Sequence, residues 1–258
     1  MDGNRADKSA QGDPQRSVEE RTIDYNGTAV YCKSKGGAEN ALVLLHGWGA
    51  SSDAMNGAFT YLSAVGRNVF ALDFPGFGKS DFPPESWGIY EYADCVRFVL
   101  ESLGLTKPVL IGHSFGGRVA IILGARGVAS KLVLTDAAGL KPRTSLKKRW
   151  AVRRYKAAKR KGRAPANAGS ADYAALSPAM KKVFVRIVNT HLDGLLGYIR
   201  VPTLLFWGKD DKDTPPYMAR RMHKAIGDSG LIMLDGAGHF AYAERNDIFC
   251  AAVRVFTQ

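Results

Sequence analysis

Short apolar runs alternate with longer amphipathic segments over most of this 258-residue chain. The short runs suit strands that are buried on both faces of a parallel sheet. They cover residues 41–45, 68–72, 109–111, 132–134, 203–206 and 231–234. Residues 87–103 repeat apolar side chains at helical spacing, and residues 118–124 and 243–256 also favour helices. The alternation predicts an α/β fold in which helices flank a mostly parallel central sheet.

The N-terminal part of the chain has a different pattern. Residues 22–25 and 28–33 flank Asn26-Gly27, a dipeptide that favours a two-residue hairpin turn, so the chain is expected to start its fold with two antiparallel strands. Residues 1–20 are polar and charged, and we interpret them as a disordered leader.

The alternation breaks between residues 140 and 200, where no strand-like run occurs. Ser177-Pro178 is a suitable helix start, because serine caps a helix and proline fits its first turn. One apolar face follows, made of Met180, Val183, Phe184, Ile187, Val188 and Leu192. We interpret residues 140–200 as a helical cap inserted after the sixth strand, over the carboxyl edge of the sheet. The core would then comprise residues 21–139 and 201–258.

The formal net charge of +12 comes from one segment. Residues 141–163 hold twelve basic side chains and no acidic one, and the remaining 24 Lys and Arg residues balance the 24 Asp and Glu residues. We interpret the segment as a solvated basic helix face that can make weak contact with an anionic surface. Aromatic residues are sparse there, with Trp150 and Tyr155 the examples, so nucleic-acid binding is not expected.

Nothing in the sequence indicates a metal or a cofactor. Cys32, Cys95 and Cys250 are far apart, lack the spacing of metal ligands and suit free thiols in a reducing compartment. The run ending in Lys79-Ser80 resembles a phosphate-binding loop, but Asp73 stands where that loop requires glycine. No stretch approaches the roughly 18 apolar residues of a membrane helix, and no secretion signal is visible. We therefore expect a cytoplasmic protein.

Four loops rich in glycine or polar residues each follow a predicted strand. They are residues 46–49, 112–117, 207–211 and 236–239. Because ligands of open α/β sheets bind at the carboxyl ends of the strands, we expect these loops to form one site. Ser114 lies between a predicted strand and a predicted helix, with glycines two residues to either side. This pattern is typical of a nucleophile whose hydroxyl is exposed on a sharp turn.

With these loops in this order, the chain resembles the α/β-hydrolase superfamily, in the branch that has a serine nucleophile and a helical cap. The matching motifs are HGWG at 46–49, LDFPGFGKS at 72–80, GHSFGG at 112–117, WGKDDKDTP at 207–215 and GAGHF at 236–240. The resemblance runs from about residue 22 to the C-terminus and is weakest in the cap. Serine at the turn distinguishes the chain from the branches that use aspartate there, the haloalkane dehalogenases and epoxide hydrolases.

The resemblance implies a catalytic role for several residues. Ser114 would be the nucleophile and His239, in the glycine-flanked loop after the last strand, the general base. The oxyanion would be stabilised by two backbone N–H groups, those of Phe115 and Trp48.

The acid that orients the histidine has two candidates. The family pattern W-G-x-x-D-x-x-x-P matches in the register that selects Asp211. Asp136 is the rival, because some members of the superfamily place the acid after the preceding strand. Asp210 and Asp213 are expected to be solvated or to cap local turns.

These expectations lead to a function. We expect hydrolysis of carboxylic esters of small to medium, mainly apolar substrates through an acyl-enzyme, without metal or cofactor. A carbon–carbon bond hydrolase of the meta-cleavage type would use the same triad but would need cationic groups in its pocket. An acyltransferase or thioesterase would differ in the acceptor or the leaving group. A non-catalytic sensor could keep the triad as part of a ligand pocket.

Overall fold

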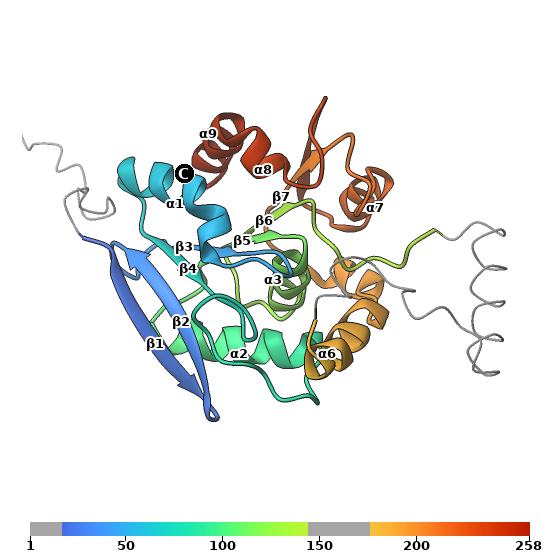
Figure 1. Cartoon of the computed structure of the whole chain (residues 1–258). Coiled ribbons are helices and arrows are strands. Elements are labelled where there is room, and N and C mark those ends of the chain that lie inside the picture. Colours follow the sequence, from blue (N-terminus) through green and yellow to red (C-terminus); the bar gives the residue numbers. More distant parts are fainter. Residues whose placement is uncertain (1–16, 144–175) are drawn as a thin grey trace, which may run out of the picture.

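A computed structural model describes residues 17–143 and 176–258 of the chain (Figure 1). Within them, an eight-stranded sheet has the strand order β1-β2-β4-β3-β5-β6-β7-β8. The strands are β1 (Glu19–Tyr25), β2 (Thr28–Lys35), β3 (Leu42–Leu45), β4 (Val69–Leu72), β5 (Val109–His113), β6 (Lys131–Thr135), β7 (Thr203–Gly208) and β8 (Ser229–Leu234). Strand β2 pairs antiparallel with both β1 and β4, and every pair from β4 to β8 is parallel. The predicted α/β class with a mostly parallel sheet is confirmed.

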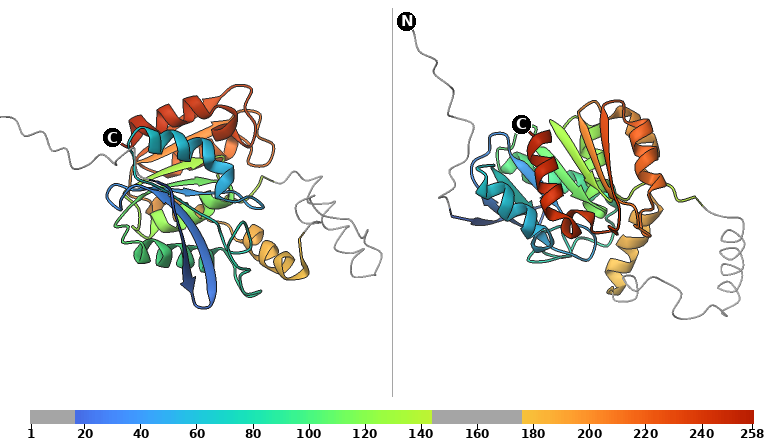
Figure 2. Two further views of the ribbon diagram at one scale, coloured as in Figure 1. Left: turned by 60° about the vertical axis from the view of Figure 1, so that its left-hand side comes forward. Right: turned by 90° about the horizontal axis from the view of Figure 1, so that it is seen from above.

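Helices cover both faces of the sheet (Figures 1 and 2). They are α1 (Asn56–Ala64), α2 (Ile89–Ser102), α3 (Phe115–Ala125), α6 (Pro178–Asn189), α7 (Tyr217–Ala225), α8 (Ala241–Glu244) and α9 (Asn246–Phe256), with 3₁₀-helices η1 (Ser52–Met55) and η2 (Asp193–Tyr198). In β3, Leu42 and Leu44 pack towards α1 and α9, whereas Val43 and Leu45 pack towards α2 and α3. Burial on both faces explains why the strands are continuous apolar runs. No helix of the described ranges is long and apolar enough to cross a bilayer.

The structure corrects two predicted boundaries. Strand β1 begins at Glu19, inside the segment interpreted as a leader, and residues 1–16 of that segment lie outside the described residues. Most side chains of this edge strand are exposed, so it carries no apolar signal. The predicted closing helix is divided at Arg245, whose φ of −131° and ψ of 49° separate α8 from α9.

The described part of the predicted cap consists of α6 and η2, which lie between β6 and β7. Helix α6 starts as expected: the side chain of Ser177 accepts a hydrogen bond from the N–H of Met180 (3.3 Å), and Pro178 occupies the first turn. The boundaries 140–200 stay a prediction. Residues 144–175, with most of the basic segment, lie outside the described residues.

Helix α6 is anchored to α3 by a buried arginine. Its residues Val183 and Ile187 are buried, whereas Val188, expected on the same face, is 37% exposed. Arg118 of α3 donates Nη1–H to the carbonyls of Ile187 (3.1 Å) and Thr190 (2.8 Å) at the C-terminal end of α6. Burial lowers the pKa of Arg118 to about 10, so the guanidinium stays charged at neutral pH. A cation is favourable at this end of a helix because the last carbonyls are unpaired and partly negative.

Close packing of α3 against β3 gives a stability prediction. A Cβ atom at Gly116 would overlap the backbone carbonyl of Leu45, which is held in the sheet. We expect Gly116→Ala to lower the free energy of unfolding by about 2–3 kcal/mol, measured by urea denaturation. Gly197→Ala in η2 is the matched control, because no atom lies within 4 Å of its Cβ position. The control should stay within about 0.5 kcal/mol of the wild type; equal stability of the two variants would contradict the packing.

Candidate active site

The link between β5 and α3 holds Ser114 in an unfavourable backbone conformation. Its φ is 47° and its ψ −104°, a region that residues other than glycine rarely adopt and that costs about 1–3 kcal/mol. The N–H of Ser114 donates to the carbonyl of Thr135 (3.2 Å), and its own carbonyl accepts from Ala138 (3.0 Å). A Cβ atom at Gly112 would lie 2.6 Å from the carbonyl oxygen of Gly116, so the turn needs glycine there. The predicted sharp turn is therefore present.

Three residues far apart in the sequence meet at this turn. Oγ of Ser114 lies 3.0 Å from Nε2 of His239, and Nδ1 of His239 lies 2.9 Å from Oδ2 of Asp211. They follow β5, β8 and β7, whose parallel arrangement brings these ends to one edge of the sheet. With the Nδ1 proton donated to the carboxylate, Nε2 accepts the hydroxyl proton of Ser114. Of the two candidate acids, Asp211 is the one on the imidazole.

The carboxylate of Asp211 is buried but fully hydrogen-bonded. Oδ1 accepts from the N–H groups of Asp213 (2.8 Å) and Thr214 (2.9 Å), and Oδ2 also accepts from the hydroxyl of Thr214 (2.6 Å). Burial alone would raise the pKa of Asp211, but the hydrogen bonds from His239 and Thr214 outweigh it and hold the pKa below its usual value. Asp211 is therefore ionised at neutral pH. Asp210 and Asp213 are exposed.

The pKa values of two neighbouring histidines, His239 and His113, are shifted in opposite directions. Burial would lower the pKa of His239, but the hydrogen bond and the charge of Asp211 outweigh it and raise the pKa above the ordinary 6.5. Burial, together with the charge of His239, lowers the pKa of His113 to about 3. The neutral His113 ring donates Nε2–H to the backbone carbonyl of His239 (2.8 Å) and so fixes the loop of the base. Neither His113 nor Thr214 was among the predicted site residues; the position of His113 beside Ser114 was the available signal.

The other candidate acid, Asp136, is hydrogen-bonded to the loops that carry Asp211 and His239. Asp136 follows β6, is fully buried and has a φ of 45°. Its carboxylate accepts hydrogen bonds from the backbone N–H groups of Gly208 (2.9 Å) and Ala241 (3.2 Å). Burial raises its pKa to about 7. Asp136 thus contacts the loops that carry Asp211 and His239.

The loop after β3 lies directly against the turn. A Cβ atom at Gly47 would be 2.7 Å from Nδ1 of His113 and 3.6 Å from Cβ of Ser114, so only glycine allows this approach. The next residue is Trp48, and Phe115 follows Ser114. Among residues 17–143 and 176–258, the backbone N–H groups of Trp48 and Phe115 have no protein acceptor. Both amides are therefore available for a ligand beside Ser114.

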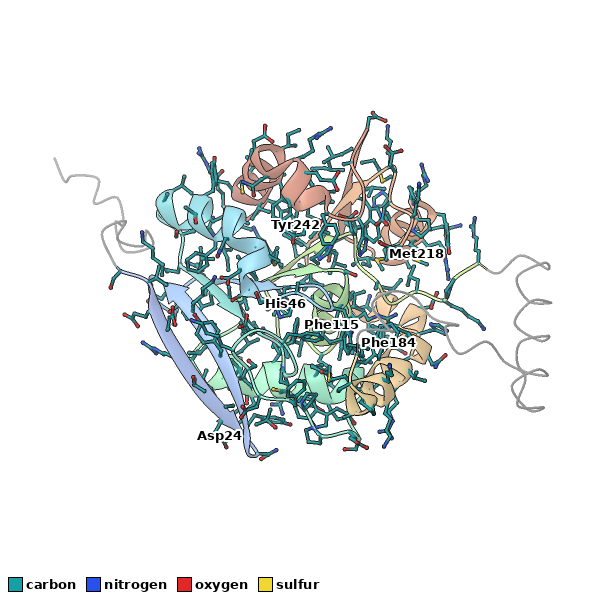
Figure 3. The ribbon with its side chains drawn as sticks, viewed as in Figure 1. Asp24, His46, Phe115, Phe184, Met218 and Tyr242 are labelled. Carbon is teal, nitrogen blue, oxygen red and sulfur yellow. The ribbon has the colours of Figure 1, made fainter. Side chains whose placement is uncertain are left out.

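An aromatic cluster connects this loop to α6. The ring of Trp48 lies 4.8 Å from that of Phe77, 5.3 Å from Phe115 and 5.2 Å from Phe184 of α6, between ring centroids. Figure 3 shows Phe115 and Phe184 where α3 meets α6. The indole Nε1 is buried without a hydrogen-bond partner in the described part of the chain, which marks these surroundings as apolar.

Comparison with known proteins agrees with this arrangement. The sequence model of the alpha/beta hydrolase family matches residues 42–252. The chain belongs to the α/β-hydrolase family. This confirms the resemblance drawn from its motifs, and the chain is an enzyme of that superfamily.

Relatives of this α/β hydrolase differ in substrate. The chain is 27% identical over 254 residues to 2-hydroxy-6-oxo-2,4-heptadienoate hydrolase of Pseudomonas putida, covering 85% of this chain and 90% of the relative. It is 27% identical over 265 residues to pimeloyl-[acyl-carrier protein] methyl ester esterase of Neisseria meningitidis, covering 88% and 96%. The solved esterase of Exiguobacterium antarcticum shares the fold, with a TM-score of 0.73, 23% identity and coverage of 90% and 96%.

The described residues of this hydrolase contain one group with the geometry to chelate a metal. Asp211, Asp213 and His239 offer ligand atoms within 4.8 Å of one another. His239 and Asp211 already hydrogen-bond to each other, however. An ion on Nδ1 would displace the proton that fixes the orientation of the ring.

The pairing of Asp211 with His239 predicts a change in titration. In Asp211→Asn the negative charge is lost while burial remains, so we expect the pKa of His239 to fall below its wild-type value. The measurement is an NMR titration of the imidazole protons. Asp210→Asn, an exposed change one residue away, is the control and should leave the titration unaltered. An unchanged pKa in Asp211→Asn would show that the carboxylate does not set the charge state of the ring.

Proposed function

We propose that this α/β hydrolase is a serine hydrolase that cleaves carboxylic esters of small to medium-sized, mainly apolar substrates through an acyl-enzyme. The observation that carries the proposal is the hydrogen-bonded chain from Ser114 through His239 to Asp211. The similarity to the methyl ester esterase of N. meningitidis supports an ester as the scissile group.

In the first half-reaction, Oγ of Ser114 bonds to the ester carbonyl carbon while its proton moves to Nε2 of His239. The carbonyl oxygen becomes negative, and the N–H groups of Trp48 and Phe115 donate to it. Such a donor typically lowers the barrier by about 3 kcal/mol. Asp211 stabilises the imidazolium. When the ester C–O bond breaks, His239 gives the proton to the departing alcohol.

In the second half-reaction, His239 takes a proton from water, whose oxygen bonds to the acyl carbon. The acid leaves, and Ser114 regains its proton from His239.

Both half-reactions need a neutral imidazole of His239 at the start. Because the pKa of His239 is raised, kcat/KM should fall as the pH decreases through that pKa, at a higher pH than for an ordinary imidazole.

The surroundings of the site support an apolar substrate. The rings of Trp48, Phe115 and Phe184 line the contact between the turn and α6. Val183 and Ile187 of α6 pack into the core. An apolar acyl group would be desolvated against these rings, at about 25 cal/mol for each Å² removed from water.

A carbon–carbon hydrolase of the meta-cleavage type is the second candidate, because of the similarity to the P. putida heptadienoate hydrolase. A dienoate carries a carboxylate that needs a cationic partner when buried. In the described ranges the buried cations are Lys33 and Arg118. Lys33 pairs with Asp53, and Arg118 binds the carbonyls of α6. The described residues therefore favour an uncharged ester.

The test is hydrolysis of p-nitrophenyl esters of graded acyl length by the wild type and Ser114→Ala. We expect turnover with an optimum at a short or medium chain, and a loss of about 10³-fold or more in kcat for Ser114→Ala, because the nucleophile is removed. His223→Ala, an exposed histidine outside the site, is the control and should keep full activity.

Each of the following results would contradict the ester proposal. Equal turnover by Ser114→Ala would exclude Ser114 as the nucleophile. Absence of turnover on every ester, with cleavage of a vinylogous diketone acid, would favour the carbon–carbon hydrolase. Transfer of the acyl group to an alcohol in place of water would favour an acyltransferase, and hydrolysis of thioesters in place of esters would favour a thioesterase. Retention of a ligand without turnover would favour a sensor.

A further inference from the structure

Asp136 uses both carboxylate oxygens on backbone groups of two different loops. Oδ1 accepts from the N–H of Gly208 (2.9 Å), and Oδ2 accepts from the N–H of Ala241 (3.2 Å). The hydroxyl of Thr135 also donates to Oδ2 (3.2 Å). The N–H of Asp136 donates to the carbonyl of Phe206 in β7 (3.1 Å), which fixes the position of its backbone.

These contacts lie next to the acid and the base. Gly208 is the last residue of β7, three residues before Asp211, and Ala241 opens α8, two residues after His239. The carbonyl of Asp136 lies 3.0 Å from the hydroxyl oxygen of Thr214. That hydroxyl also lies 2.6 Å from Oδ2 of Asp211 and 3.3 Å from Nδ1 of His239. Asp136 therefore contacts the acid loop on both sides of Asp211 and the base loop just after His239.

A fully buried carboxylate is a costly way to satisfy two amides, because desolvation disfavours its charge. An apolar residue would avoid that cost but would leave the N–H groups of Gly208 and Ala241 without an acceptor. The two loops also contact each other, through the N–H of Asp210, which donates to the carbonyl of Ala237 (2.9 Å), but this bond ties neither loop to the end of β6. His113 binds the base loop alone, through the carbonyl of His239. The position of Asp136 therefore serves the relative placement of the loops.

We propose that Asp136 is a positioning residue that holds Asp211 and His239 at hydrogen-bonding distance by tying the loops after β7 and β8 to the end of β6. Its effect on turnover rests on the proposed function of the Ser114–His239–Asp211 chain. Asp136 does not contact the reacting atoms; it acts through the backbone of both loops.

The test compares Asp136→Asn with Asp235→Asn, an exposed aspartate after β8 that pairs with Lys209. Asparagine keeps one oxygen acceptor but places an NH2 group against one of the two amides. The N–H of either Gly208 or Ala241 therefore loses its acceptor. We expect kcat on the preferred ester to fall by about 10²-fold, the order of loss that a displacement of about 1 Å produces, with KM within about twofold of the wild type. Asp235→Asn should keep both constants.

A spectroscopic readout separates positioning from general destabilisation. The proton between Nδ1 of His239 and Asp211 should give a far-downfield proton resonance in the wild type, shifted or lost in Asp136→Asn at a temperature where circular dichroism shows the variant folded. Unchanged kcat, or an unchanged downfield resonance with a lower melting temperature, would overturn the proposal.

One arm, hydrogen exchange of the wild type, depends neither on ester turnover nor on the folding of the variant. Hydrogen exchange of the wild type should show the amides of Gly208 and Ala241 to be protected, and exchange as fast as that of an exposed loop amide would overturn the proposal. If the wild type cleaves no ester, the ester proposal fails, while the downfield resonance and the exchange rates still decide the role of Asp136.

Discussion

The strained backbone at Ser114 is the constraint on which the rest of the structure depends. A serine with a φ of 47° persists only where its surroundings hold it. Here the sheet and the first turn of α3 do so, through hydrogen bonds with Thr135 and Ala138 and through the absence of side chains at Gly112 and Gly116. These contacts require β3, β5 and β6 to stay in register. The buried core on both faces of the sheet therefore helps to hold Ser114 in its strained conformation.

Two buried carboxylates, those of Asp211 and Asp136, lie near one imidazole, and their environments shift their pKa values in opposite directions. Asp211 gains hydrogen bonds from Thr214 and His239, which keep its pKa low, whereas burial raises the pKa of Asp136. Opposite shifts in neighbouring acids mark different roles. Asp211 supplies the charge that the imidazole pairs with, and Asp136 supplies acceptors for the backbone. The neutral His113 beside them adds a hydrogen bond without adding a second positive charge.

The sequence was sufficient to predict those parts of the fold and of the site in which residues close together in the chain are also close in space. Each residue of the Ser114–His239–Asp211 chain lies in the loop or turn that follows its strand, so locating the strands also located the site. The first three residues of edge strand β1 (19–21) were not predicted as strand because their exposed side chains are polar, and the break at Arg245 carries no glycine or proline. The contacts of Asp136 span 72 and 105 residues, so no local pattern records them. From its residue type and its place after a strand, Asp136 was a candidate for the acid that orients His239. Only the fold shows that its carboxylate binds backbone amides instead.

Trp48 contacts both helix α6 and the turn of Ser114. Its backbone N–H belongs to the loop that approaches Ser114, while its ring packs on Phe184 of the cap helix. A different position of α6 would therefore move the ring and, through it, the loop that we propose binds the oxyanion. Arg118 limits that movement, because its charged hydrogen bonds hold the C-terminal end of α6 against α3, one turn after Ser114. If the cap limits substrate size and the loop of Trp48 binds the oxyanion, as we propose, the two functions are coupled through the contact between Trp48 and Phe184.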